Sequence, residues 1–307
     1  MRRGGVVVLG PSPLLEVSIE PSDAGPTIRV IPGGQGVWVA RMAATMGAEV
    51  TLCGLSGGET GSTLAPMLGD APYACVLVET AGPAGCFVVD QRHEPATEVA
   101  SRWAPPPSTT EVEALLAAAF DACEHADVLV VGNPMPGDAL ARDVYTRVVA
   151  AATARGVAVV VDLSSPRVEA AVRGGPATAK LNDWELAELV TAPVGTPHDR
   201  GTAIHRLLDL GATSVVVTRG ASTVFAVDER GSGTELTPPR VGVGRAAGCG
   251  DAMTGAMAAM LAQGTDWLDA VALGMAAGAA HYAGRDETSR TAIEALARQV
   301  SRRRVRL

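Results

Sequence analysis

Residues 244–263, GRAAGCGDAMTGAMAAMLAQ, hold the group of side chains best suited to chemistry. Gly248 and Gly250 flank Cys249, Asp251 follows at once, and an apolar stretch of helix-forming residues comes behind them. A Gly-rich turn that opens a helix directs unpaired N–H groups and the positive end of the helix dipole at one point, which suits an anion such as a phosphoryl group in transfer. Asp251 beside such an anion hole can take the proton of an attacking hydroxyl group. The same residues also fit an ordinary loop with a capping aspartate.

Cys249 has two interpretations. The helix N-terminus could lower the pKa of its thiol and make it reactive, or the residue could simply pack where a small side chain is needed. The five cysteines are dispersed and include no C-x-x-C pair, which is typical of reduced thiols in a cytosolic protein.

Two other segments with possible ligand-binding residues stand at the predicted start of a helix. Gly33 and Gly34, in the stretch PGGQG, would let the backbone pass close to a ligand. Asn182 and Glu185 are three residues apart and follow Lys180, the only lysine of the chain. An amide oxygen and a carboxylate on one helix face suit hydrated Mg²⁺, although the same pair also forms a capping box; the two roles are compatible.

A fourth segment, VVVTRGA, runs from a strand into a turn at Thr218, Arg219 and Gly220, where a nucleotide could rest. Order and spacing over the whole chain carry more weight than any one of these motifs.

These segments need a scaffold, and the hydrophobic pattern predicts one. Short Val-rich runs read as buried parallel strands and alternate with helical segments, at 34–47, 111–123, 138–155, 183–190, 199–210, 251–263 and 267–283. Such alternation predicts a mostly parallel sheet with helices on both faces and ligands beyond the carboxyl ends of the strands. Residues 14–31 and 84–103 alternate apolar and polar and predict a small antiparallel lid within a single domain, 1–307.

Composition excludes several classes of protein. With 307 residues, 47% of them hydrophobic and 19% charged, the chain can build a large core. A net charge of −8 argues against nucleic-acid binding, and the basic tail SRRRVRL reads as a solvated terminus. No stretch reads as a signal peptide or membrane span, so we expect a soluble cytoplasmic protein.

Taken together and in order, these segments resemble the PfkB (ribokinase-like) carbohydrate kinases, and within them the 1-phosphofructokinase and tagatose-6-phosphate kinase branch. The resemblance covers nearly the whole chain and rests on PGGQGVWVARMAATMGAEVTLCGLSGGETG, VVGNPMPGDALARDVYTRVVAAATARGVAVVVDLSS, AKLNDWELAEL, VVVTRGASTVFAV, AAGCGDAMTGAMAAML and the early GPSPLLE. It implies a three-layer α/β/α fold with a small β lid, and ATP-dependent transfer of the γ-phosphoryl group to a hydroxymethyl group of a sugar or sugar phosphate.

The resemblance also implies roles for the transfer residues. Asp251 would be the base, and the N–H groups of Ala247–Gly250, which include Gly248, Cys249 and Gly250, would form the anion hole. Asn182 and Glu185 would order Mg²⁺ through water, with Asn182 also near the nucleotide. The nucleotide side would be lined by Thr218, Arg219 and Gly220.

On the acceptor side the resemblance implies Glu16, Gly33, Gly34, Gln35 and Trp38 as sugar-binding positions, but three of them depart from the family pattern. Gln35 stands where the branch often has lysine, Trp38 replaces an asparagine, and Glu16 replaces an aspartate one methylene shorter.

The lid arginine of the branch has no match in TAGPAGCFVVD, so two cations that could hold an acceptor phosphate are missing. Arg41, Arg92 and Arg102 could replace them, or could be surface arginines. Trp38 could stack on a sugar ring or fill the pocket. An unphosphorylated sugar or a nucleoside as acceptor, or a non-catalytic nucleotide- or sugar-binding protein, therefore stay as alternatives. The family's lids often meet in a dimer, which makes a homodimer an expectation.

Overall fold

A central sheet organises the protein. The computed structural model describes residues 4–93, 96–135, 139–175, 177–190, 194, 196–242, 244–284 and 288–305. The strands of the central sheet follow the order β14-β13-β12-β11-β10-β9-β8-β1-β4-β5. From β5 to β11 the pairings are parallel, and β12, β13 and β14 extend the sheet in antiparallel fashion. The strands are β1 (Gly5–Leu9), β4 (Glu49–Gly57), β5 (Ala74–Thr80), β8 (Val128–Gly132), β9 (Ala158–Asp162), β10 (Ala177–Asn182), β11 (Ala212–Thr218), β12 (Val224–Val227), β13 (Gly233–Thr237) and β14 (Ser301–Val305).

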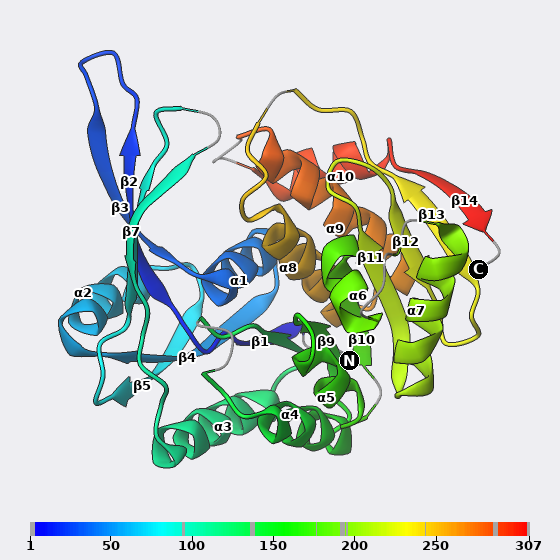
Figure 1. Cartoon of the computed structure of the whole chain (residues 1–307), viewed down its shortest axis with the longest axis horizontal. Coiled ribbons are helices and arrows are strands. Elements are labelled where there is room, and N and C mark those ends of the chain that lie inside the picture. Colours follow the sequence, from blue (N-terminus) through cyan, green and yellow to red (C-terminus); the bar gives the residue numbers. More distant parts are fainter. Residues whose placement is uncertain are drawn as a thin grey trace.

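Helices cover both faces of this sheet, as Figure 1 shows. One apolar cluster lies between the sheet and α1 (Gln35–Thr45), α2 (Gly58–Gly69), α8 (Cys249–Ala262), α9 (Trp267–Tyr282) and α10 (Arg290–Ala297). The other cluster lies beneath α3 (Thr109–Cys123), α4 (Arg142–Ala154), α5 (Arg167–Val172), α6 (Asp183–Val190) and α7 (Pro197–Asp209). Both faces of the parallel strands are therefore buried, which is why β1 reads GVVVL without alternation. None of the helices in the described ranges is long and apolar enough to span a membrane.

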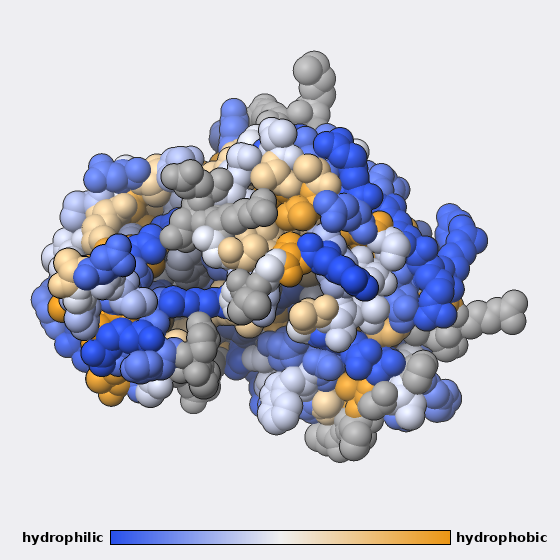
Figure 2. Space-filling view, turned by 90° about the horizontal axis from the view of Figure 1, so that it is seen from above, coloured by the Kyte–Doolittle hydropathy of each residue, from blue (hydrophilic) through white to orange (hydrophobic). Residues whose placement is uncertain are grey.

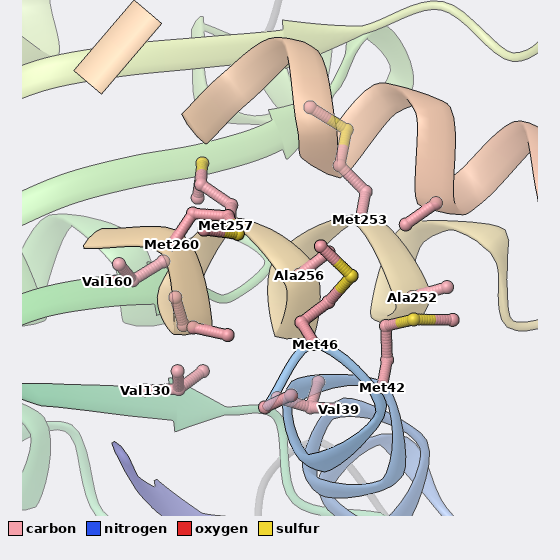
Figure 3. Packing of buried hydrophobic residues seen from close by; sticks show 14 of the residues in the cluster. Val39, Met42, Met46, Val130, Val160, Ala252, Met253, Ala256, Met257 and Met260 are labelled. Atoms are coloured by element: carbon pink, nitrogen blue, oxygen red, sulfur yellow. The ribbon is translucent and has the colours of Figure 1, made fainter. Parts of the chain in front are cut away.

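Helix α8 is apolar on nearly all sides because it lies in the middle of one layer. Its Met257 and Met260 lie over Val130 and Val160 of the sheet, as Figure 3 shows, and α1 packs beside it. The two helices meet at Gly255, where an added Cβ atom would lie 2.3 Å from the carbonyl oxygen of Val39. A methionine-rich core seals irregular gaps between helices and keeps the first turn of α8 fixed on the sheet.

The lid is a separate sheet of four strands in the order β3-β2-β6-β7 that projects from the body in Figure 1. Its strands are β2 (Leu14–Glu20), β3 (Thr27–Gly33), β6 (Gly85–Asp90) and β7 (Thr97–Arg102), so both segments expected to form the lid do so. The expectation of an antiparallel lid is wrong at its centre, since β2 and β6 pair in parallel. The two segments belong to different hairpins, and the parallel seam joins them.

Other differences from the sequence-based expectations have local causes. Residues 301–305 of the basic tail are the edge strand β14, and Arg302 and Arg303 pair there with Asp269 and Glu235 at 2.6 and 2.9 Å. The helices at 58–69 and 290–297 were not expected. Helix α4 begins at Arg142, and residue 138 of the range expected for it, 138–155, lies outside the described ranges.

Candidate active site

The polar segments singled out in the sequence meet at the carboxyl ends of the parallel strands. The N-terminal ends of α1 and α8 point to this edge, and β9 and β10 end there with Asp162 and Asn182. Figure 2 looks down on this side of the molecule, which is largely hydrophilic and is hollowed between the lid side and the body. Parallel sheets bind ligands at such an edge.

Asp251 is in the first turn of α8, which begins one residue after Gly248. Gly248 has a left-handed backbone (φ 77°), and an added Cβ atom would lie 2.8 Å from Nε2 of His281. Ring nitrogen Nε2 of His281 is also 3.0 Å from the carbonyl oxygen of Ala247. The end of α9 thus holds the segment that precedes Asp251, and only glycine fits at the turn.

A buried ion pair lies beneath this turn. Nζ of Lys180 donates to Oδ2 of Asp162 at 2.9 Å, and the hydroxyl group of Thr254 donates to the same oxygen at 2.5 Å. A Cβ atom at Gly250 would lie 3.2 Å from Nζ of Lys180, so the ammonium group borders the turn that is predicted to form the anion hole. Burial lowers the pKa of Lys180, but the charges of Asp162, Asp251 and Glu185 outweigh burial and the pKa is raised. Lys180 is therefore charged.

The side chain of Gln35 connects α1 to this ion pair and to Asp251. Its Oε1 accepts from the backbone N–H of Asn133 at 2.5 Å, and its Nε2 donates to the carbonyl oxygen of Asp162 at 3.2 Å. The amide also lies close enough to the carboxylate of Asp251 to lower its pKa. Gln35, which was expected to face the sugar, is thus held by the ends of β8 and β9 and lies next to Asp251. We call Gln35, Asp162, Lys180, Asp251 and Thr254 the transfer centre.

The transfer centre sets the charge of Asp251. Burial raises the pKa of Asp251 to about 7, and the negative charge of Asp162 adds to this, while Lys180 and the amide of Gln35 act in the opposite direction. A carboxyl group with a pKa close to neutral can both accept and release a proton near pH 7.

Asn182 and Glu185 form the capping box that their spacing allows. The backbone N–H of Asn182 donates to Oε2 of Glu185 at 2.9 Å, and the N–H of Glu185 donates to Oδ1 of Asn182 at 2.8 Å. Burial raises the pKa of Glu185, and the nearby charge of Asp162 raises it further. The box fixes both side chains at the end of β10, close to the transfer centre.

The segment expected on the nucleotide side lies next to this box. Thr218 ends β11 directly opposite Asn182 in the strand register, and its hydroxyl group donates to the carbonyl oxygen of Leu181 at 3.4 Å. Arg219 pairs with Asp183 at 3.7 Å, and Gly220 has open space where a side chain would be.

On the acceptor side, Glu16 lies on β2 and its Oε2 packs against Gly33, 3.1 Å from where a Cβ atom would be. Burial raises the pKa of Glu16. Gly34 is the residue before α1. Trp38 lies between two other side chains: the guanidinium of Arg41 is 4.7 Å from its ring centroid, and the ring of His281 meets it edge-on at 5.7 Å. We call Glu16, Gly33, Trp38 and Arg41 the acceptor side.

Two of the three candidate arginines already have carboxylate partners. Arg92 pairs with Asp90 at 2.6 Å, and Arg102 pairs with Glu59 at the same distance. Arg41 has no ion pair with a carboxylate within the described ranges, although its charge acts on Glu16. Arg41 is therefore the one of the three left to meet an anion.

Cys249 does not have the reactive thiol that one interpretation allowed. Its Sγ donates to the carbonyl oxygen of Arg245 at 3.4 Å. Burial, reinforced by the charge of Asp251, raises its pKa to about 11, which outweighs the helix N-terminus. The packing role holds.

The structure thus brings together Asp251, Gln35, Asn182 and Glu185 at one edge, with Thr218 and Arg219 beside them. It adds three residues to which the sequence analysis assigned no role, Asp162, Lys180 and Thr254. Two of them could have been found from the sequence. Lys180 is the only lysine and stands two residues before Asn182, and Thr254 lies one helical turn after Asp251. Nothing in the sequence pointed to Asp162.

Comparison with known proteins identifies the class. A family described as pfkB family carbohydrate kinase matches residues 13–287. The chain is 30% identical over 256 residues to ATP-dependent 6-phosphofructokinase isozyme 2 of Escherichia coli, covering 81% of each protein. It is also 30% identical over 137 residues, 43% of this chain and 42% of the relative, to a 1-phosphofructokinase of Xanthomonas campestris. The tetrameric inhibited form of Escherichia coli phosphofructokinase-2 has the same fold, with a TM-score of 0.82 and 25% identity over 97% of this chain and 99% of that one.

The protein is therefore a carbohydrate kinase that uses ATP. The chain belongs to the pfkB family, and the resemblance seen in its motifs is confirmed together with the three-layer fold. Its activity is phosphoryl transfer to a sugar or sugar phosphate.

Proposed function

We propose that the chain transfers the γ-phosphoryl group of ATP to a hydroxymethyl group of a hexose phosphate, with Asp251 as the base. The observation that carries this proposal is the position of Asp251: in the first turn of α8, close to the amide of Gln35, and with its pKa raised to about 7 by burial. The names of the relatives, which are phosphofructokinases, support a fructose phosphate as acceptor.

The reaction needs one proton acceptor and a place for negative charge. The hydroxyl oxygen of the acceptor forms a bond to the γ-phosphorus, the bond from that phosphorus to the bridging oxygen of ADP breaks, and the hydroxyl proton goes to the carboxylate of Asp251. The first-turn N–H groups around Gly248–Gly250 and the ammonium group of Lys180 would stabilise the charge of the phosphoryl group, because they are fixed before the reaction.

The site also fits Mg²⁺ held through water. Asp162, Glu185 and Asp251 lie around a single cation, Lys180, and each of these charges acts on its neighbours. This excess of negative charge favours a divalent ion. Direct ligation is not what the site offers, because within the described ranges no three acidic, His or Cys side chains converge on one point. Asn182 and Glu185 would orient its waters. When bound, the ion would neutralise phosphate charge.

The first experiment is ADP release from MgATP with fructose 1-phosphate, fructose 6-phosphate, tagatose 6-phosphate, free hexoses, ribose and nucleosides. Turnover with one of the phosphates supports the proposal, and Arg41 is then the first candidate for the cation that holds it. Turnover only with an unphosphorylated acceptor contradicts the acceptor class but not the chemistry. No turnover with any acceptor, while ATP still binds, contradicts the proposed reaction on these substrates.

We also propose that the lids of two copies meet in a homodimer. The lid strands carry exposed apolar side chains at Ile28 (69% exposed), Val30 (43%) and Val99 (58%), and Ile28 and Val30 share one face of β3. Light scattering should give twice the mass of the chain, and the double variant Ile28→Glu, Val30→Glu should give a monomer. A monomeric parent protein would contradict this.

A further inference from the structure

A hydrogen-bonded contact joins the lid to the segment that is predicted to form the anion hole. Nη2 of Arg245 donates to the carbonyl oxygen of Gln91 at 3.1 Å, and Nη1 donates to Oε1 of the same residue. The two residues are 154 positions apart: Gln91 directly follows β6 of the lid, and Arg245 lies three residues before Gly248. The planar guanidinium donates to a main-chain and a side-chain oxygen from two separate nitrogens in a rigid fork, a geometry that the single ammonium group of lysine lacks.

Each end of this contact is anchored. On the lid, the N–H of Gln91 donates to the carbonyl oxygen of Ile19 at 2.9 Å and continues the β2–β6 seam. The next residue, Arg92, closes the turn by binding Asp90 through its backbone N–H and its guanidinium. A force on Gln91 is therefore transmitted to the lid sheet as a whole.

On the body, the backbone N–H of Arg245 donates to the carbonyl oxygen of Tyr282 at 2.9 Å, at the end of α9. Its own carbonyl oxygen accepts from Sγ of Cys249, at the start of α8. The segment from Arg245 to Cys249 is thus a short bridge between the lid contact and the first turn that carries Asp251.

We propose that Arg245 is a positioning residue that orders the anion-hole segment as long as the lid lies against the body, as it does in this structure. The inference rests on the proposed function of the site. With the lid in place, the fork from Arg245 to Gln91 fixes the segment 245–249; when the lid moves away, this support is lost. An acceptor that holds the lid against the body would in this way strengthen the phosphoryl site, while ATP alone would not.

The first test needs no substrate and so does not depend on the proposed reaction. Hydrogen exchange is measured on the wild type, on Arg245→Gln and on a matched control, Arg303→Gln, which loses an arginine–carboxylate pair (2.9 Å to Glu235) far from the lid. In Arg245→Gln we expect amide exchange to become about tenfold faster both in 85–91 and in 244–250, the size expected from losing hydrogen bonds to a charged group. In the control neither range should change. Faster exchange in 244–250 alone would overturn the proposal.

The second test uses the acceptor found by the ADP-release panel. Arg245→Gln should lower kcat/KM for the acceptor about tenfold, with the Kd for ATP changed less than about twofold. Gln91→Ala, which keeps the carbonyl oxygen, should have a smaller effect, and the double variant should be no worse than Arg245→Gln alone. Arg245→Lys should not restore the rate. Additive losses, or an equal loss of ATP affinity, would overturn the proposal. If Asp251→Asn is inactive while Arg245→Gln has the kcat/KM of the wild type, the role of Arg245 is refuted and the proposed function stands.

Discussion

Around Asp251 the polar side chains hydrogen-bond one another and the core, whereas around Glu16 and Trp38 they lie at the joint between lid and body. The side chain of Gln35 bonds both Asp162 and Asn133 and lies close to Asp251. On the acceptor side, Trp38 is held by a cation–π contact and an aromatic edge, and Glu16 packs against a glycine. Buried, mutually bonded groups can take only one arrangement, while stacking contacts tolerate substitution. Substitutions in the transfer centre should therefore cause a large loss of turnover, whereas substitutions on the acceptor side should cause small changes in acceptor binding.

The largest effect is expected at the base. Asp251→Asn should lower kcat by about three orders of magnitude or more while ATP binding stays nearly intact, because a positioned proton acceptor is lost but the anion hole is not. Steady-state turnover and ATP titration measure the two quantities. The matched control is Asp269→Asn, an exposed carboxylate that pairs only with Arg302 across the surface. Unchanged turnover in Asp251→Asn would mean that another group is the base.

The ion pair of the transfer centre should matter for stability as well as rate. Lys180→Met leaves the buried carboxylate of Asp162 without its cation and should lower the free energy of unfolding by about 3 kcal/mol. Arg302→Met, which breaks an exposed pair of similar length with Asp269, should cost less than about 1 kcal/mol in the same urea titration.

A second variant separates stability from chemistry at Lys180. Adding Asp162→Asn to Lys180→Met removes the stranded charge and should recover part of the stability but none of the turnover. If Lys180→Met and Arg302→Met lowered the free energy of unfolding by the same amount, the claim that the transfer centre is held more firmly than the surface would be wrong.

Much of this contrast could be predicted from the sequence, and the reasons are physical. Gly248 to Asp251 and Asn182 to Glu185 are local motifs whose backbone requirements leave a mark on residue types. The resemblance placed Gln35 on the acceptor side, at a position that is often lysine in the branch, but its hydrogen bonds run to Asn133 and Asp162, about a hundred residues away. Contacts of that kind depend on strand order, which no local pattern records. The parallel seam of the lid was hidden for the same reason.

The pH dependence should report the environment of Asp251. The reactive form is the carboxylate, so kcat/KM should fall about tenfold for each pH unit below a pKa of about 7. Stability should follow the opposite course. Burial raises the pKa of Asp251 above 3.8, so the fold favours the protonated form, and the wild type should lose stability relative to Asp251→Asn as pH rises from about 4 to about 7.

The size of this difference follows from the pKa. A rise from 3.8 to about 7 corresponds to ~4 kcal/mol, and since the carboxylate is only partly buried we expect about half of that above pH 7. Urea unfolding of both proteins at pH 4.5 and pH 8 measures it. Equal stability of the two proteins at pH 8 would show that Asp251 keeps an ordinary pKa in the fold.

The smallest effects are expected on the acceptor side, and they decide what Trp38 does there. If Trp38 serves to hold Arg41 beside the acceptor, then Trp38→Asn and Arg41→Gln should raise the KM of the acceptor in the same direction, by about three- to tenfold, the range of a cation–π contact. ATP affinity should stay constant in both. Arg155→Gln is the matched control, since its guanidinium stacks on Phe120 at 5.1 Å outside the site.

The opposite result would also be informative. If Trp38 blocks the space that an acceptor would use, Trp38→Asn should lower the KM while Arg41→Gln raises it, because the first opens the pocket and the second removes a cation. Either outcome keeps the change gradual, since the base, the anion hole and the ion pair of Lys180 are held by contacts in which neither Trp38 nor Arg41 takes part. Trp38→Asn could instead lose as much turnover as Asp251→Asn. That result would mean that the two regions act as one unit, connected through His281 and the carbonyl oxygen of Ala247.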